Sequence, residues 1–289
     1  MRYVLGFVIF GCLLRTAAAE APLDVWPGNA PGESTRSLGQ KLPFRKGEVP
    51  PVTRVVKITR PTFTVHLAEK PNGSAAVILP GGGFGKVVPD KEGTEAARWL
   101  NQHGVSAFVV SYRTTESGGA PGWEKPLQDA QRALSLIRGQ AERWMIDPKR
   151  VGLVGFSAGG QVAARLLCAG NVRSYAAVDK YDQLPFRPDF SLLIYPWNIY
   201  DSKRGTLLPE LDVPADCPPS FLVHTDDDRS SSLGAVLFYA ALKRQGIKSA
   251  LHVYGNGGHG YGLRDVAGSQ ISSWPQHAAH WLGRYTTRP

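Results

Sequence analysis

The sequence lacks the marks of several classes of protein. Its 289 residues include only three cysteines. The two in the body of the chain, Cys168 and Cys217, are too few for a disulfide scaffold, and the sequence leaves open whether they pair. No run of lysine and arginine is longer than two residues, so nucleic-acid binding is not indicated. What is present is 43% hydrophobic residues and a formal net charge of +9, enough for one large core under a basic surface.

The N-terminus has the pattern of a targeting segment. A charged start is followed by a nearly continuous apolar run over residues 3–14, and an Ala-x-Ala sequence ends at Ala19. This predicts a secretory signal peptide over residues 1–19, and a secreted or periplasmic protein. A lipoprotein acylated at Cys12 is the less favoured alternative, because the better cleavage site lies downstream. No second long apolar segment follows, so we expect no membrane partner after cleavage.

The rest of the chain alternates between strand and helix patterns. Residues 20–52, rich in proline, glycine and charge, are expected to form an extended arm, and residues 53–289 a single α/β domain. Buried strands that alternate with helices predict a mostly parallel twisted sheet of about eight strands, with helices on both faces. The strands are expected at 53–59, 62–67, 75–79, 105–110, 150–155, 190–195, 220–224 and 250–254, and the helices at 91–103, 126–144, 158–169, 233–245 and 274–285.

Two connections carry further expectations. The first two strands, separated by Arg60-Pro61, are predicted to pair as an antiparallel hairpin. The connection over residues 171–187 is long enough to form a lid or a wall of a substrate site.

Ser157 is the candidate nucleophile. It lies in the stretch GFSAGG, directly after a buried strand and before a helix. A tight turn at this point needs small neighbours, which Gly155 and Gly159 provide, and it lifts the serine hydroxyl out of the sheet. The pattern alone is weak evidence in a chain with 32 glycines.

A serine needs a base, and the base needs an orienting carboxylate. His259 is the best of the seven histidines, because the glycines of GNGGHGYG after the last strand let it reach a serine on another loop. The cluster HTDDD follows the preceding strand. Asp228 is the preferred acid, and Asp227 is the alternative.

A glycine run supplies the remaining part of a hydrolytic site. LPGGGFG follows the third strand and would let backbone N–H groups approach a substrate carbonyl. Nucleotide-binding glycine patterns do not fit this stretch. Gly82, Gly83 and Ala158 are the predicted oxyanion donors, and Phe84 is a further candidate at the site.

These stretches together resemble the α/β-hydrolase superfamily over most of residues 53–289. The order serine, aspartate, histidine is the order of that fold's triad. WPGNAPG, PGGGFG, GFSAGG, HTDDD and GGHGYG are similar to the branch of bacterial exported carbohydrate esterases of the acetylxylan-esterase type. The resemblance implies an α/β-hydrolase catalytic domain over 53–289 and hydrolysis of acetyl esters on a polysaccharide such as xylan.

The expected activity is that of a secreted serine esterase without a metal or organic cofactor. Trp26 and Trp197 are candidate platforms for a sugar ring. A feruloyl esterase or a general short-chain carboxylesterase is the nearest alternative. A serine peptidase and a non-catalytic hydrolase-like binding protein are alternatives of another class. The acyl group, the sugar and the oligomeric state stay open.

Overall fold

The computed structural model describes residues 21–115 and 122–287. The expected signal peptide over residues 1–19 therefore lies outside the described residues. The main sheet has eight strands in the order β1-β4-β6-β5-β7-β8-β11-β12. In that order the strands are β1 (Leu23–Asp24), β4 (Thr62–His66), β6 (Ser106–Ser111), β5 (Ala75–Leu79), β7 (Val151–Phe156), β8 (Ser191–Ile194), β11 (Ser220–Thr225) and β12 (Ala250–Tyr254).

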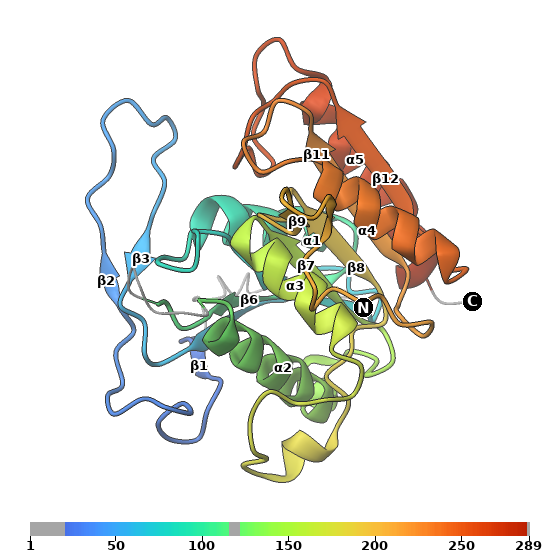
Figure 1. Cartoon of the computed structure of the whole chain (residues 1–289). Helices are drawn as coiled ribbons and strands as arrows, with labels where there is room; N and C mark the ends of the chain where they lie inside the picture. Colours follow the sequence, from blue (N-terminus) through green and yellow to red (C-terminus); the bar gives the residue numbers. More distant parts are fainter. Residues whose placement is uncertain (1–20, 116–121, 288–289) are drawn as a thin grey trace, which may run out of the picture.

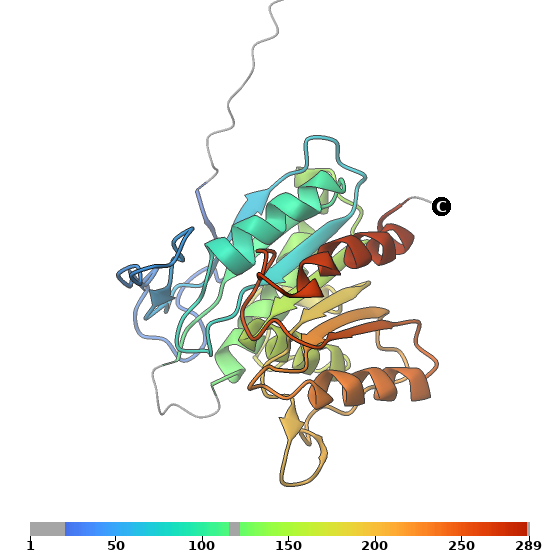
Figure 2. The same cartoon turned by 90° about the horizontal axis from the view of Figure 1, so that it is seen from above.

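Helices cover both faces of this sheet (Figure 2). Helices α2, α3 and α4 pack on one face, and α1 and α5 pack on the other. The helices are α1 (Glu95–Gln102), α2 (Glu124–Gly139), α3 (Ala158–Cys168), α4 (Leu233–Arg244) and α5 (Trp274–Thr286), with short helical segments η1 (Asp90–Thr94), η2 (Ala141–Trp144), η3 (Lys180–Gln183) and η4 (Gln270–Ser273). The α/β fold expected from the sequence is confirmed.

Strand β5 shows why a buried strand could be predicted from the sequence. All five of its residues are buried apolar residues. Ala75, Val77 and Leu79 belong to the core on the α2 side, whereas Ala76 and Ile78 belong to the core on the α1 side. A strand covered on both faces has no solvent face, so its sequence is apolar throughout.

The sheet begins with antiparallel strands, as expected, but the predicted hairpin partner is wrong. Strand β4 pairs with β1 from the arm and with β6. Strand β3 (Val55–Val56) instead pairs with β2 (Gln40–Lys41) in a separate two-stranded sheet. Lys57 has φ of +57°, which interrupts the extended run between β3 and β4. A further small pair, β9 (Tyr200–Asp201) with β10 (Thr206–Leu207), was not predicted.

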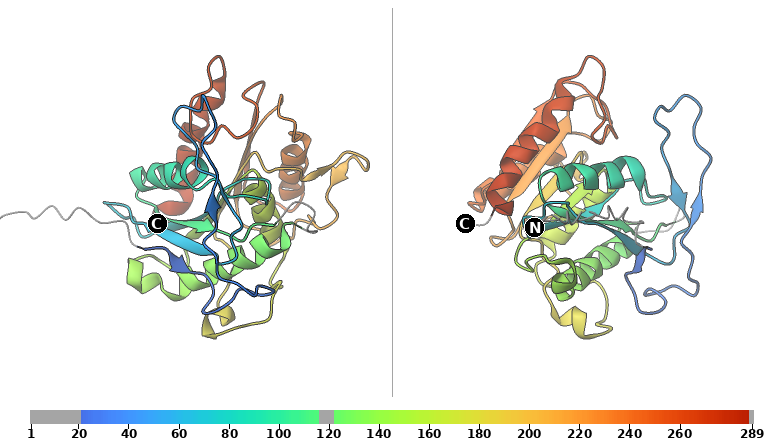
Figure 3. Two further views of the ribbon diagram at one scale, coloured as in Figure 1. Left: turned by 90° about the vertical axis from the view of Figure 1, so that its left-hand side faces the viewer. Right: turned by 180° about the vertical axis from the view of Figure 1, so that it is seen from behind.

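The loop between β2 and β3 rises above the same edge of the sheet as the loops after β11 and β12 (Figure 1; Figure 3, right). Strands β5, β7, β8, β11 and β12 run parallel to one another, so their carboxyl ends share this edge. Loops from distant parts of the sequence therefore surround one region, as is usual for ligand sites of open α/β sheets.

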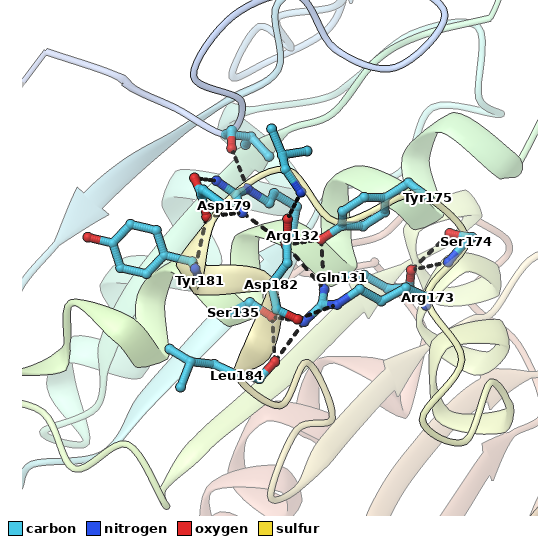
Figure 4. A network of polar contacts seen from close by, with 12 residues as sticks. Gln131, Arg132, Ser135, Arg173, Ser174, Tyr175, Asp179, Tyr181, Asp182 and Leu184 are labelled. Atoms are coloured by element: carbon cyan, nitrogen blue, oxygen red, sulfur yellow. Dashed lines mark hydrogen bonds and ion pairs between the residues drawn. The ribbon is translucent and has the colours of Figure 1, made fainter.

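The long connection over residues 171–187 does not act as a wall of that region. It is fastened to α2 by a dense polar network (Figure 4). Arg132 of α2 lies 2.9 Å from an Asp182 carboxylate oxygen and donates to Asp179 at 2.8 Å. Tyr175 donates to Asp182 at 2.7 Å. The expectation of a lid or substrate wall is not supported, because these contacts hold the segment against α2.

Candidate active site

Ser157 lies at the turn between β7 and α3, with φ of 53° and ψ of −118°. This conformation is unfavourable for any residue except glycine. The neighbouring glycines make the turn sterically feasible. A Cβ at Gly159 would lie 2.1 Å from the carbonyl oxygen of Leu79, and a Cβ at Gly155 would lie 2.5 Å from the oxygen of Gly159. The sequence GFSAGG therefore builds a sharp turn that presents the serine side chain.

His259 reaches Ser157 from the loop after β12. Its Nε2 lies 2.7 Å from Ser157 Oγ. Gly258 and Gly260 on either side have φ of +65° and +75°, which lets the loop bend tightly around the histidine. Thr225 donates to the carbonyl of Gly258 at 2.7 Å and so fastens this loop to the end of β11.

The structure brings Asp228, not Asp227, to the histidine. Asp228 Oδ2 lies 2.5 Å from His259 Nδ1, and its other oxygen accepts a hydrogen bond from Ser230 N at 2.9 Å. The Asp228 side chain is 1% exposed. Asp227 accepts instead from the backbone N–H groups of Gly258 and Gly257, at 2.8 and 3.1 Å. These bonds lower the pKa of Asp227, which therefore holds the loop rather than the imidazole.

His224 lies behind Asp228, with its Nδ1 3.8 Å from the same carboxylate oxygen. Burial lowers the pKa of His224, so it is neutral at pH 7. The negative charge of Asp228 is then directed to His259 alone.

The predicted oxyanion donors lie next to Ser157. Gly82 and Gly83 line the same pocket as Ser157 and His259. Gly82 has φ of +139°, and a Cβ there would lie 2.1 Å from the oxygen of Lys86. Ala158 is the first residue of α3, where backbone N–H groups point at a ligand. Among the described residues, the N–H groups of Gly82, Gly83 and Ala158 donate to no protein acceptor.

The sequence did not indicate Glu92 as a site residue. Its buried carboxylate accepts from Gly81 N at 2.7 Å and from the hydroxyl of Tyr195 at 2.8 Å. The Tyr195 hydroxyl in turn accepts from Gly262 N at 3.0 Å, and its ring lies edge-on 5.0 Å from that of His259. Burial raises the pKa of Glu92. Glu92 thus joins the glycine run to the histidine loop.

A pocket of about 440 Å³ opens at Ser157. Half-buried Trp197 lines it, as expected for a sugar platform. Phe84 is buried behind this wall, with its ring centre 5.7 Å from that of Trp197. Trp26 does not reach the pocket, which corrects the second predicted platform. It is 2% exposed and donates to Asp129 of α2 at 2.8 Å, because its indole packs against Arg132 of the same helix and edge-on against Tyr175.

Three further features concern metals, thiols and membranes. No cluster of histidine, cysteine, aspartate and glutamate in the described residues could hold a metal ion. Cys168 and Cys217 are free thiols in the structure, and burial raises the pKa of Cys217 to about 12. Within residues 21–115 and 122–287, no helix is long and apolar enough to cross a membrane.

Comparison with known protein families agrees with this arrangement. The fold and the loop constellation at its edge define an α/β hydrolase. The prolyl oligopeptidase family model matches residues 125–288, and the BD-FAE family model matches residues 63–185. Since the first match covers more than half of the 289 residues, the chain belongs to the prolyl oligopeptidase family.

Two curated relatives act on xylan according to their names. The acetylxylan esterase of Xylanibacter ruminicola is 29% identical over 221 residues, which make up 68% of this chain and 43% of that protein. Endo-1,4-beta-xylanase B of Butyrivibrio fibrisolvens is 32% identical over 205 residues, which make up 64% of this chain and 32% of that protein. The chain therefore spans less than half the length of either relative.

Solved structures give the same fold. An acetyl ester-xyloside bifunctional hydrolase from Caldicellulosiruptor lactoaceticus superposes with a TM-score of 0.71 at 26% identity, covering 91% of this chain and 96% of that one. A thermophilic esterase from Thermogutta terrifontis superposes with a TM-score of 0.64 at 18% identity, covering 85% and 92% of the two chains. At 18% identity the second likeness concerns the fold alone.

Proposed function

We propose that the chain is a secreted serine esterase that hydrolyses short-chain, chiefly acetyl, esters on a plant polysaccharide or oligosaccharide such as acetylated xylan. One observation carries the proposal. Ser157 Oγ, His259 and Asp228 form a continuous hydrogen-bonded relay, with contacts of 2.7 and 2.5 Å, at the mouth of a pocket. Unpartnered N–H groups face the same pocket, and this is the arrangement that acyl transfer to serine requires.

In the proposed reaction, His259 Nε2 takes the proton of Ser157 as Oγ attacks the ester carbonyl. The N–H groups of Gly82, Gly83 and Ala158 hold the resulting oxyanion. Asp228 fixes the imidazole tautomer and stabilises its cation. The proton passes to the leaving sugar oxygen, and an acyl-serine remains. Water then gives a proton to His259 and attacks the acyl carbonyl. The bond to Oγ breaks as His259 returns that proton to Ser157 Oγ, and acetate leaves.

Three features support an acetylated sugar as the substrate. The X. ruminicola relative is named an acetylxylan esterase, and the C. lactoaceticus structure is named a bifunctional hydrolase of acetyl esters and xylosides. Trp197 offers an aromatic surface at the pocket wall, which suits the C–H face of a sugar ring. The connection over residues 171–187 packs on α2, so it gives the pocket no apolar cover for a long acyl chain.

A serine peptidase is the second candidate, because the matching family model is that of prolyl oligopeptidases. The same three side chains could attack a peptide carbonyl. The two activities separate on matched chromogenic substrates. We expect turnover of nitrophenyl acetate without turnover of prolyl nitroanilides, and the reverse result would favour the peptidase.

The decisive experiment measures acetate released from acetylated xylan together with kcat/KM for acetyl, butyryl and octanoyl nitrophenyl esters. A small acyl pocket should favour acetyl over octanoyl by roughly 10-fold to 200-fold, because overpacking costs about 1–3 kcal/mol. A maximum at octanoyl, or no acetate from any acetylated sugar, would contradict the proposed substrate.

A further inference from the structure

The pocket at Ser157 contains an excess of positive charge. Of the side chains that the structure describes, four cations line it, but only two carboxylates. One of these, Glu92, already accepts two hydrogen bonds from its own neighbours. The other, Glu48, forms an ion pair with Arg54 and accepts a 2.8 Å hydrogen bond from it. The remaining cations are Arg45, Lys86 and Lys91.

These three cations have no carboxylate of their own. None forms an ion pair within the part of the chain that the structure describes. Burial lowers the pKa of Lys86, and the charges of Arg45 and Arg54 lower it further. Burial, with the charge of Arg264, likewise lowers the pKa of Lys91, although the charges of Glu92, Glu95 and Glu48 act in the opposite direction. Like charges held together in a partly desolvated site repel one another, and a bound anion would relieve that repulsion.

A second cavity of about 670 Å³ adjoins the first and shares Glu48, Val52 and Lys91 with it. It lies between the loop joining β2 to β3 and the loop that follows β12, and Arg264 and Tyr261 line it. The two loops rise above the same edge of the sheet (Figure 3, right), and Arg264 of the second loop donates to the carbonyl of Pro50 in the first at 2.7 Å. The two cavities therefore form a groove that continues away from Ser157, with Lys91 at the junction.

We propose that this groove binds an acidic glycan, in which a sugar next to the acetylated one carries a fixed negative charge held by Lys86 and Lys91. The charged group is the carboxylate of a uronic acid or a sulfate ester. The inference rests on the proposed esterase function for its catalytic part. The negative charge belongs to the glycan and not to the acyl group, because Lys91 lies at the junction of the two cavities, where the groove leads away from Ser157.

The first experiment measures binding without catalysis. The Ser157→Ala protein is titrated by calorimetry with tetragalacturonate, with a sulfated oligosaccharide of equal length, and with neutral xylotetraose. At least one acidic ligand should bind about 10-fold or more tightly than xylotetraose in low salt, and 0.5 M NaCl should abolish most of the difference. The tighter of the two acidic ligands identifies the charged group. Equal binding of neutral and acidic ligands, or no binding of either acidic ligand, overturns the inference.

The second experiment assigns the effect to these side chains. In Arg45→Gln/Lys86→Gln/Lys91→Gln, kcat/KM for an acetylated acidic oligosaccharide should fall about 10-fold to 100-fold more than for an acetylated neutral one. The control Lys46→Gln/Lys203→Gln/Arg204→Gln removes the same number of charges from exposed positions that do not line the pocket. An equal loss in the two triple variants overturns the inference. If the first triple variant does not fold, Arg45→Gln alone, at an exposed loop position, serves the same comparison.

The two proposals fail in different ways. A protein that hydrolyses nitrophenyl acetate but treats acidic and neutral glycans alike retains the esterase function and loses the acidic substrate. A protein that binds tetragalacturonate but hydrolyses no ester loses the esterase function and retains the basic groove for an acidic glycan.

Discussion

Two basic regions of the molecule handle positive charge in opposite ways. Beneath α2, Arg132 lies within 2.9 Å of Asp179 and Asp182, and Arg173 donates to the backbone oxygen of Leu184 at 2.6 Å (Figure 4). At the pocket, Arg45, Lys86 and Lys91 form no ion pair with any carboxylate of the described residues. A buried cation is costly unless it is paired. The paired arginines beneath α2, which we call the matched region, therefore stabilise the fold. The unpaired cations at the pocket are instead suited to bind an anionic ligand.

The same contrast holds for the backbone and the hydroxyl groups. Beneath α2, the Ser135 hydroxyl donates to Leu184 O at 3.1 Å and accepts from Arg173. At the pocket, Ser157 has a strained backbone, and three N–H groups beside it find no protein acceptor in residues 21–115 and 122–287. Unsatisfied donors and strain gather where substrate would complete the structure. The following variants test this contrast, in order of expected effect.

Ser157→Ala should have the largest effect, on turnover alone. Esterase activity should fall by about 10⁴-fold or more, because only the oxyanion donors and binding remain. Labelling by a fluorophosphonate probe should also be lost, while the melting temperature is retained. Ser202→Ala, at an exposed position, is the matched control. Near-normal activity in the Ser157 variant would refute the proposed function.

Asp228→Asn should lower kcat by roughly 10²-fold to 10⁴-fold, because the amide no longer stabilises the imidazolium or fixes its tautomer. Asp227→Asn should cost far less, since this side chain only accepts from loop N–H groups. Steady-state kinetics on nitrophenyl acetate compare the two variants. A larger loss of kcat in Asp227→Asn than in Asp228→Asn would assign the role of the triad acid to Asp227.

Asp182→Asn should damage stability rather than turnover. It removes the buried one of the two carboxylates that pair with Arg132 of α2, and breaking a buried pair costs about 3–5 kcal/mol. Denaturant unfolding should show this loss, with kcat unchanged in the folded fraction. Unchanged stability would mean that the network beneath α2 is not what holds residues 171–187.

Low pH should weaken the ion pairs of Arg132 with Asp179 and Asp182 beneath α2. The hydrogen bond from Arg132 lowers the pKa of Asp179, and the pKa of Asp182 is also lowered, since its bonds to Tyr175, Val178 and Arg132 outweigh burial. A carboxylate with a lowered folded pKa stabilises the protein fully above its unfolded pKa, and this stability is lost as pH falls through the folded value. In Asp182→Asn, the fall in melting temperature below about pH 4 should be shallower than in the unaltered protein.

Lys86→Gln should have the smallest effect, and of the opposite sign. Because the pKa of this lysine is lowered in the folded protein, its charged form opposes folding until pH rises through the folded value. Removing the charge should raise the melting temperature by about 1–3 °C at pH 7. Lys203→Gln, at an exposed turn, should leave it unchanged. A clearly lower melting temperature in Lys86→Gln would show that the charge of this lysine stabilises the fold.

The sequence predicted those elements whose pattern is local. Ala75–Leu79 and Ala250–Tyr254 are strands with the expected boundaries. The first is apolar throughout, and the second ends directly before Gly255. Pairing was harder to predict. The partner of β4 comes from the arm and not from the adjacent strand, since Lys57 turns the chain at a point where its side chain gives no sign of a positive φ.

The residues of the candidate site that lie in sequence motifs could be predicted. Ser157, Asp228 and His259 each follow the end of a strand, and parallel strands bring such loops together. Glu92 has a signal that could have revealed it, since it lies four residues before buried Ala96 and thus on the same helical face. Arg45 could not have been found, because nothing in its neighbourhood indicates that the arm folds back over a pocket made 100 residues later.

The backbone of Ser157 also has an evolutionary consequence. Glycine would occupy that φ without strain, so a copy of the chain with glycine in place of the serine should fold more stably, by about 1 kcal/mol or more. Replacement of the serine by glycine should thus increase the stability of the fold and abolish turnover. Only selection on the reaction keeps serine at this position. A gene duplicate released from that selection would drift toward a sturdier, inert protein that still carries a basic groove.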